Sequence, residues 1–136
     1  MSPDRDPSHP QSRLRRARSN LARARSLATL PDVIYEDPCF DAQQAAEKAL
    51  KAVLVHRKVH LPKTHALADL LTLVVKAGVV VPPEIEEATS LTPYAVEARY
   101  PGPSEDVTAD DHAEAVRIAE RVLRWAEALI EPVNSC

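Results

Sequence analysis

Only two glycines, Gly78 and Gly102, occur among the 136 residues of this chain, so it cannot contain a glycine-rich phosphate loop. Ala, Leu, Glu and Arg dominate the composition, and all four are strong helix formers. β-Branched residues cluster only at 79–81, where three valines precede two prolines. A single strand there would have no partner strand, and we therefore expect an all-α fold.

Hydrophobic residues make up 45% of the chain, which is enough for one core, but no apolar run exceeds four residues. Such runs are too short for a transmembrane helix or a signal-peptide core. The two cysteines, Cys39 and Cys136, form neither a metal-ligand motif nor a disulfide framework. We expect a cytoplasmic protein without membrane association, in which Cys39 is a small buried hydrophobic residue.

Apolar residues recur with helical spacing in successive segments, which predicts an up-and-down bundle of about five helices. The expected helices cover 11–29, 38–57, a segment from Thr64 to a stop at Gly78, 83–91 with a continuation over 93–99, and 109–131. Residues 1–12 are expected to be a flexible tail, 13–131 the helical bundle, and 132–136 a short C-terminal tail.

Local signals mark several helix ends. Asp37 is a predicted N-cap, and Thr108 with Asp111 has the spacing of a capping box. Within the second helix Glu47 and Lys51 stand four residues apart in the favourable order, and we place this pair on the side opposite the apolar face.

The charge is distributed unevenly along the chain. Residues 1–30 carry seven arginines and two aspartates, whereas the rest of the chain has an excess of acidic residues. Six of those arginines lie between 13 and 25 with no acidic residue among them. This helix is either a solvated face or a surface that attracts RNA or an acidic partner.

The segment "PKTHAL", residues 62–67, places Lys63, Thr64 and His65 at the start of a helix. Free N–H groups and the positive end of the helix dipole favour phosphate at such a position. The alternative is a purely structural cap in which a half-buried His65 donates to a backbone carbonyl.

A second cluster lies in "YAVEARYPG", residues 94–102, where Tyr94 and Tyr100 flank Arg99. At about 100° per residue, Arg99 stands about 140° from Tyr94 around a helix, so the two need not touch. Arg99 is either a ligand-binding cation or a partner for a nearby carboxylate, with Tyr100 packed at the end of the bundle.

Other familiar sites are not indicated. The five histidines are scattered; His56 and His60 share a helical spacing, but the helix is expected to end between them and no acidic third ligand is evident. We therefore expect no metal and no cofactor, and no Ser-His-Asp or Cys-His arrangement is suggested.

Four segments in sequence resemble the HEPN domain family: "FDAQQAAEKALKAVL", "LPKTHALADLL", "LTPYAVEARYPG" and "TADDHAEAVRIAERVLRW". The resemblance covers about 13–131. It implies a compact up-and-down helical bundle that commonly dimerises. It also implies a small nucleotidyltransferase encoded nearby, the two forming a toxin–antitoxin-like pair.

Many HEPN proteins are metal-independent ribonucleases with an arginine followed four to six residues later by a histidine. Here Arg57 and His60 are three residues apart, and no histidine follows Arg99 at that distance. The chain instead resembles the branch that carries "RYP", in which the ribonuclease motif is missing or altered.

These features favour a dimeric nucleotide- or RNA-binding module, with candidate contacts from Lys48, Lys63, Thr64, His65, Arg99 and Tyr100. One alternative is a metal-independent ribonuclease toxin in which His65 is the base and Arg99 stabilises the developing charge. The other is a purely structural partner or antitoxin.

Overall fold

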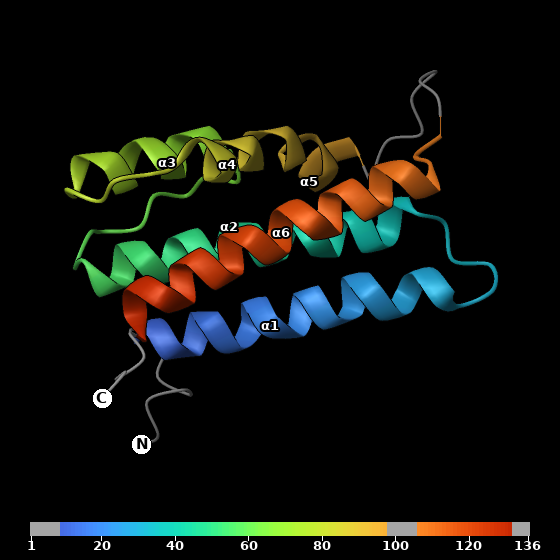
Figure 1. Ribbon diagram of the computed structural model, residues 1–136, viewed down its shortest axis with the longest axis horizontal. Coiled ribbons are helices and arrows are strands. Elements are labelled where there is room, and N and C mark those ends of the chain that lie inside the picture. Colours follow the sequence, from blue (N-terminus) through green and yellow to red (C-terminus); the bar gives the residue numbers. More distant parts are fainter. Residues whose placement is uncertain (1–8, 98–105, 132–136) are drawn as a thin grey trace.

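The computed structural model describes residues 9–97 and 106–131, and within them all regular structure is helical (Figure 1). The α-helices are α1 (Pro10–Ser26), α2 (Glu36–His56), α3 (Leu67–Lys76), α4 (Pro83–Glu86), α5 (Pro93–Glu97) and α6 (Ala109–Ile130). Two 3₁₀ helices, η2 (Leu27–Thr29) and η3 (Glu87–Leu91), follow α1 and α4. The predicted all-α bundle is confirmed, with α4, η3 and α5 forming the fourth segment.

Helix α2 lies at the centre of the bundle, between α1 and α6 (Figure 1). Asn20 and Arg23 of α1 contact Asp41, while Arg18 and Arg25 of the same helix contact Glu127 and Glu120 of α6. The two pairs with α6 make that helix antiparallel to α1, and α2 is antiparallel to α1 as well, because Asn20 also contacts Lys48 (Figure 1). Five alanines of α2 are fully buried in this layer: Ala42, Ala45, Ala46, Ala49 and Ala52.

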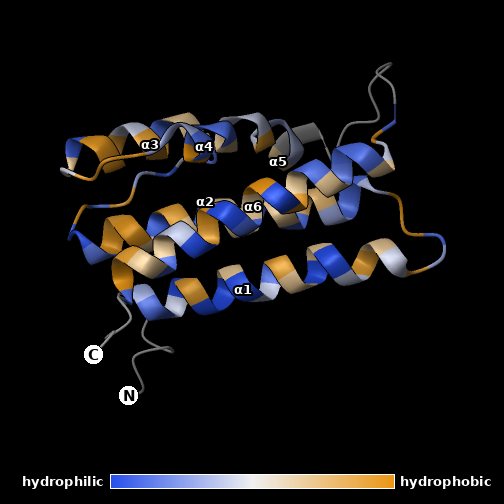
Figure 2. Cartoon of the chain, in the orientation of Figure 1, coloured by the Kyte–Doolittle hydropathy of each residue, from blue (hydrophilic) through white to orange (hydrophobic). Residues whose placement is uncertain are grey.

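Helices α3, α4 and α5 form a second layer that carries the chain back to the start of α6 (Figure 1). The predicted apolar face of α3 is buried at Leu67, Leu70, Leu71 and Val74, whereas Val75 is exposed. Figure 2 shows the contrast between these apolar surfaces and the largely polar exterior of α1. None of the described helices is both long and apolar enough to cross a membrane.

Several predicted helix ends are confirmed. Gly78 has a φ of 91°, and the N–H of Val79 donates to the carbonyl of Val74, which closes α3 in the expected way. Thr108 and Asp111 form the reciprocal hydrogen bonds of a capping box at the start of α6. The connector at 79–81 is not a strand.

Other predicted boundaries are wrong. Helix α2 begins at Glu36 with Tyr35 as its N-cap, so Asp37 lies inside the first turn. Helix α1, by contrast, begins at Pro10, one residue before its predicted start at 11, and so takes in the last residues of the predicted tail. Helix α3 begins at Leu67 rather than at Thr64, because the Thr64 hydroxyl accepts from the N–H of Ala66 in a turn that precedes the helix.

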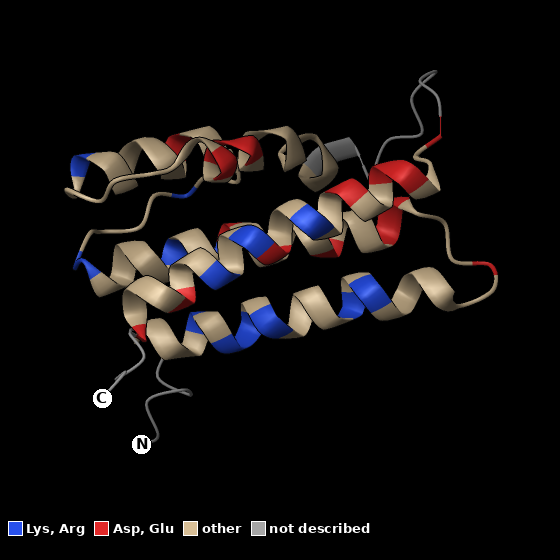
Figure 3. Cartoon of the chain, in the orientation of Figure 1, with Lys and Arg blue, Asp and Glu red and all other residues tan. Residues whose placement is uncertain are grey.

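Basic residues follow one another along α1 (Figure 3), and three of its arginines, Arg18, Arg23 and Arg25, pair with acidic residues of neighbouring helices. Arg18 pairs with Glu127 and Glu131, and Arg25 pairs with Glu120, all on the α6 side of the bundle. Exposed pairs of this kind each contribute about 0–1 kcal/mol, so their role is to align α1 rather than to dominate stability. Several residues of the basic segment are therefore ion-pair partners and not free cations.

Because these alanines of α2 are fully buried, larger side chains at their positions should destabilise the fold. Ala46→Leu should lower the free energy of unfolding by roughly 1–3 kcal/mol, because the added methylenes have no space between α2 and its neighbours. Ala22→Leu, on the exposed face of α1, should change it by less than about 0.5 kcal/mol. Urea denaturation measures both, and equal effects of the two variants would contradict the packing seen here.

Candidate functional site

The residues predicted to bind phosphate lie in two places. Lys48 belongs to α2, and Lys63, Thr64 and His65 belong to the segment that joins α2 to α3. Arg99 and Tyr100 lie outside the described residues, so their relation to the others stays a prediction.

The carboxylate of Glu47 lies at the centre of this region, beneath the segment that joins α2 to α3. Its Oε1 accepts from Gln43 Nε2 at 3.0 Å and lies 3.0 Å from His65 Nδ1, and its Oε2 accepts from Lys51 Nζ at 2.9 Å. The Glu47 side chain is only 4% exposed. Its predicted position on an outer face is wrong, because α2 is covered on several sides and little of it faces solvent.

Two opposing effects set the charge of Glu47. Burial raises the pKa of the carboxyl group, but hydrogen bonds from Lys51, Gln43 and His65 outweigh burial and lower the pKa below its ordinary value. The carboxylate is therefore ionised at neutral pH. The result is a buried anion surrounded by donors, two of which can carry positive charge.

The imidazole of His65 connects this anion to solvent. Its side chain is 70% exposed, and Nδ1 faces the Glu47 carboxylate. The predicted alternative, a half-buried histidine donating to a backbone carbonyl, is therefore wrong. When a neutral imidazole donates through Nδ1 to a carboxylate, Nε2 carries the lone pair, so this arrangement directs a potential base outward.

The start of α3 is less open to phosphate than predicted. The N–H of Ala66 donates to the Thr64 hydroxyl at 3.0 Å, and the N–H of Leu67 donates to the hydroxyl of Thr92 at 3.1 Å. Two of the N–H groups expected to bind phosphate therefore already donate to hydroxyl groups of the protein. Lys63 remains exposed and has no ion pair with any residue in 9–97 or 106–131.

Lys48 lies on the side of α2 that faces α1. Its Nζ donates to Asn20 Oδ1 at 2.7 Å, and Asn20 in turn donates to the buried Asp41. Burial lowers the pKa of Lys48, and the charge of Arg16 reinforces this shift. Lys51, three residues further along α2, pairs with Glu47, and Glu47 in turn contacts His65.

The HEPN domain model matches residues 10–129. The chain belongs to the HEPN domain family. No curated protein sequence matches it significantly.

Two crystal structures resemble this HEPN domain. TT1696 from Thermus thermophilus is 34% identical, with 87% of this chain and 95% of that chain covered and a TM-score of 0.77. ST0689, an archaeal HEPN homologue, is 27% identical, with 90% and 98% covered and a TM-score of 0.70. The family predicted from the four sequence segments is thus confirmed.

The remaining predictions about chemistry in this HEPN domain concern metals and cysteine. No group of His, Cys, Asp and Glu in the described ranges has an arrangement that could hold a metal ion. Cys39 is fully buried, and burial raises the pKa of its thiol to about 12, which makes a nucleophilic role unfavourable. The prediction of a buried hydrophobic Cys39 is confirmed.

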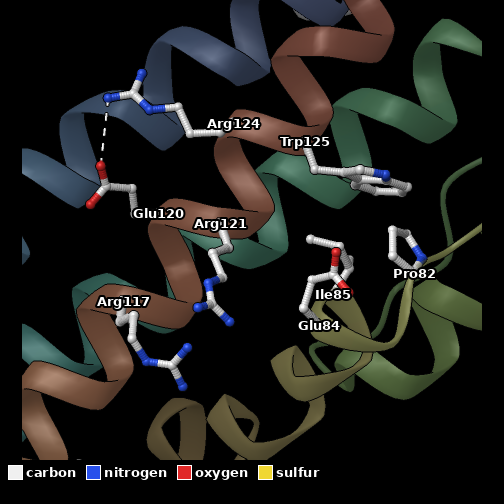
Figure 4. A pocket seen from close by; sticks show the side chains of 8 residues that line it. All are labelled: Pro82, Glu84, Ile85, Arg117, Glu120, Arg121, Arg124 and Trp125. Carbon is white, nitrogen blue, oxygen red and sulfur yellow. Dashed lines mark ion pairs between the residues drawn. The ribbon is translucent and has the colours of Figure 1, made fainter.

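Sequence reasoning missed a groove on the HEPN bundle between α6 and the segment around α4 (Figure 4). Its volume is about 790 Å³, and it is lined by Pro82, Glu84, Ile85, Arg117, Glu120, Arg121, Arg124 and Trp125. One signal could have indicated it: three arginines recur along one stretch of the last helix, beside the single tryptophan of the chain.

Glu47 should make stability depend on pH. Its folded-state pKa is lowered, so its contribution is present at neutral pH and is lost as the pH falls through the folded pKa. Between about pH 5 and about pH 3, the free energy of unfolding should fall more steeply in the parent than in Glu47→Gln. Urea denaturation at a series of pH values measures this difference.

Glu114→Gln is the matched control for that experiment. Glu114 also has a lowered pKa, caused by a hydrogen bond from Arg117, but this pair is exposed and solvent screens it. Its variant should keep the parent slope. If the free energy of unfolding depends on pH equally steeply in Glu47→Gln, in Glu114→Gln and in the parent, the titration of Glu47 is not the cause of this pH dependence.

Proposed function

We propose that this HEPN-domain protein is a dimeric nucleotide- or RNA-binding module that acts with a small nucleotidyltransferase in a toxin–antitoxin-like pair. The observation that supports binding is a contrast in exposure: acidic side chains of this region are buried, and basic ones face solvent. Asp41 and Glu47 are buried, whereas Arg16, Lys63 and His65 are exposed. The anions hold the framework and the cations face solvent.

Phosphate chemistry suits this surface. Phosphate groups bind ammonium and guanidinium donors through charge-assisted hydrogen bonds, which are roughly twice as strong as neutral ones. Lys63 supplies an exposed ammonium group, and His65 can donate through Nε2 when its ring is protonated, whereas Lys48 already donates to Asn20 and the Thr64 hydroxyl to Asp69. Lys48, Thr64, Arg99 and Tyr100 stay proposed members of the same site. The dimer and the nucleotidyltransferase partner are supported by the resemblance to the "RYP" branch of the family.

Removing two proposed contacts should weaken binding without unfolding the chain. Lys63→Ala/Arg99→Ala should bind ATP or a short RNA about tenfold or more weakly, because each lost charged hydrogen bond is worth about 1.5–3 kcal/mol. Isothermal titration calorimetry measures affinity. Affinity for RNA should also fall steeply as salt is added.

Lys76→Ala/Arg124→Ala is the matched control, since it removes one exposed lysine and one exposed arginine elsewhere. It should bind as the parent does. Loss of thermal stability in parallel with the loss of binding would instead assign Lys63 and Arg99 a structural role. Co-purification with an adjacent nucleotidyltransferase tests the partner, and its failure would remove that part of the proposal.

The contact between His65 and Glu47 supports metal-independent RNA cleavage as a second candidate function. With Nδ1 donating to the carboxylate, Nε2 of His65 is free to take the proton from a ribose 2′-hydroxyl. The 2′-oxygen would then attack phosphorus, and the 5′-oxygen would leave with a proton from solvent. Arg99 is the proposed cation for the charge that develops on the phosphoryl oxygens.

Cleavage can be separated from binding by a direct assay. The protein should cut RNA in the presence of a chelator, and His65→Ala should abolish cutting by removing the proposed base. Gel analysis of end-labelled RNA measures it, with Lys76→Ala as a variant that retains activity. The ribonuclease proposal is wrong if micromolar protein cleaves no RNA. If the protein neither cleaves nor binds RNA, the role of a structural partner or antitoxin remains.

A further inference from the structure

The groove between α6 and the segment around α4 shares no residue with the Glu47–His65 region. At about 790 Å³ its volume falls within the range of small-molecule sites, about 300–1,000 Å³. Its two ends differ in chemistry, and this difference indicates the kind of ligand it accepts.

One end of the groove is apolar and flat. The indole of Trp125 lies near Pro82 and Ile85, which come from the segment opposite α6 (Figure 4). Trp125 is partly buried against the core, while Ile85 is almost fully buried. Packing of this kind holds the indole ring in place, and an aromatic ring beside a proline favours contact with another planar ring.

The other end carries two arginine side chains. Arg117 and Arg121 are one helical turn apart on α6, and both reach the same oxygen of Glu87, at 3.4 Å and 3.8 Å. Arg117 also pairs with Glu114. Both distances to Glu87 are long and the glutamate is 46% exposed, so this contact is weak and an anion from a ligand can replace it.

Arg124 differs from these two arginines. It points away from the centre of the groove and pairs with Glu120 at 3.7 Å and with Glu127 at 3.3 Å (Figure 4). Its guanidinium is therefore directed away from the space between Arg117 and Arg121. This makes Arg124 a lining residue without a role in the cationic end, and a suitable control.

We propose that this groove binds a small planar ring that carries an anionic group, such as an aryl phosphate or an aromatic carboxylate. The ring packs against Trp125 and Pro82, and the anion lies between Arg117 and Arg121. Glu84 lines the groove beside Ile85 and disfavours a second negative charge on the ligand (Figure 4). This site is additional to the nucleotide or RNA surface around Glu47 and does not depend on it.

The fluorescence of Trp125 can report binding in this groove, because Trp125 is the single tryptophan of the chain. Phenyl phosphate is a suitable probe, since it joins a planar ring to an anion and absorbs little where tryptophan is excited. Phenol and inorganic phosphate are its two separate halves. Phenyl phosphate should quench Trp125 saturably, with an affinity about tenfold or more higher than that of either half.

Two variants locate the anion. Arg121→Gln should weaken phenyl phosphate about tenfold and leave phenol unchanged, whereas Arg124→Gln should behave as the parent. Circular dichroism melting checks that each variant is folded. If Arg121→Gln is unfolded, Arg117→Gln tests the same end of the groove.

Three results would overturn the proposal. The first is quenching by phenol as strong as that by phenyl phosphate, which would reduce the site to an apolar contact. The second is an equal loss in the Arg121 and Arg124 variants. The third is no saturable quenching by phenyl phosphate at all. A failure of nucleotide binding at the Glu47 surface would change none of these readouts.

Discussion

Helix α2 carries acidic and amide side chains into the interior of the bundle, and its neighbours are arranged so that these groups find partners. Asp41 accepts from Asn20 and Arg23 of α1, and Glu47 accepts from Lys51, Gln43 and His65. A buried carboxylate without donors would be strongly destabilising. The positions of α1 and of the segment before α3 therefore depend on the polar residues of α2 as much as on its alanines.

This constraint also shapes the surface. The buried carboxylates hold several basic groups near α2, whereas Arg16, Lys63 and His65 are exposed. The arginines of α1 are divided in the same way. Arg18 and Arg25 are engaged by acids on α6, while Arg16 lies near Lys48. A count of arginines along the sequence could not separate these two groups, because the separation depends on which helix each residue faces.

The two candidate sites follow from different parts of the same architecture. The Glu47–His65 contact forms where the segment after α2 folds back over that helix before α3 begins. The groove at Trp125 forms where the second layer meets α6. His65 was recognisable from its position before a helix, but its partner Glu47 was placed on the wrong face. Trp125 and Arg121 were recognisable only as members of an amphipathic helix.

Features that depend on neighbouring residues follow from the amino-acid sequence alone. The helical class, the Gly78 stop, the capping box of Thr108 and Asp111, and membership of the HEPN family all follow from local patterns or from their order along the chain. Three features depend instead on the tertiary fold: the burial of Glu47, the hydrogen bond from the Leu67 N–H to the Thr92 hydroxyl, and the groove between α6 and Pro82. The physical reason is that each of these joins segments distant in the chain, where packing between helices overrides the preference of any single one.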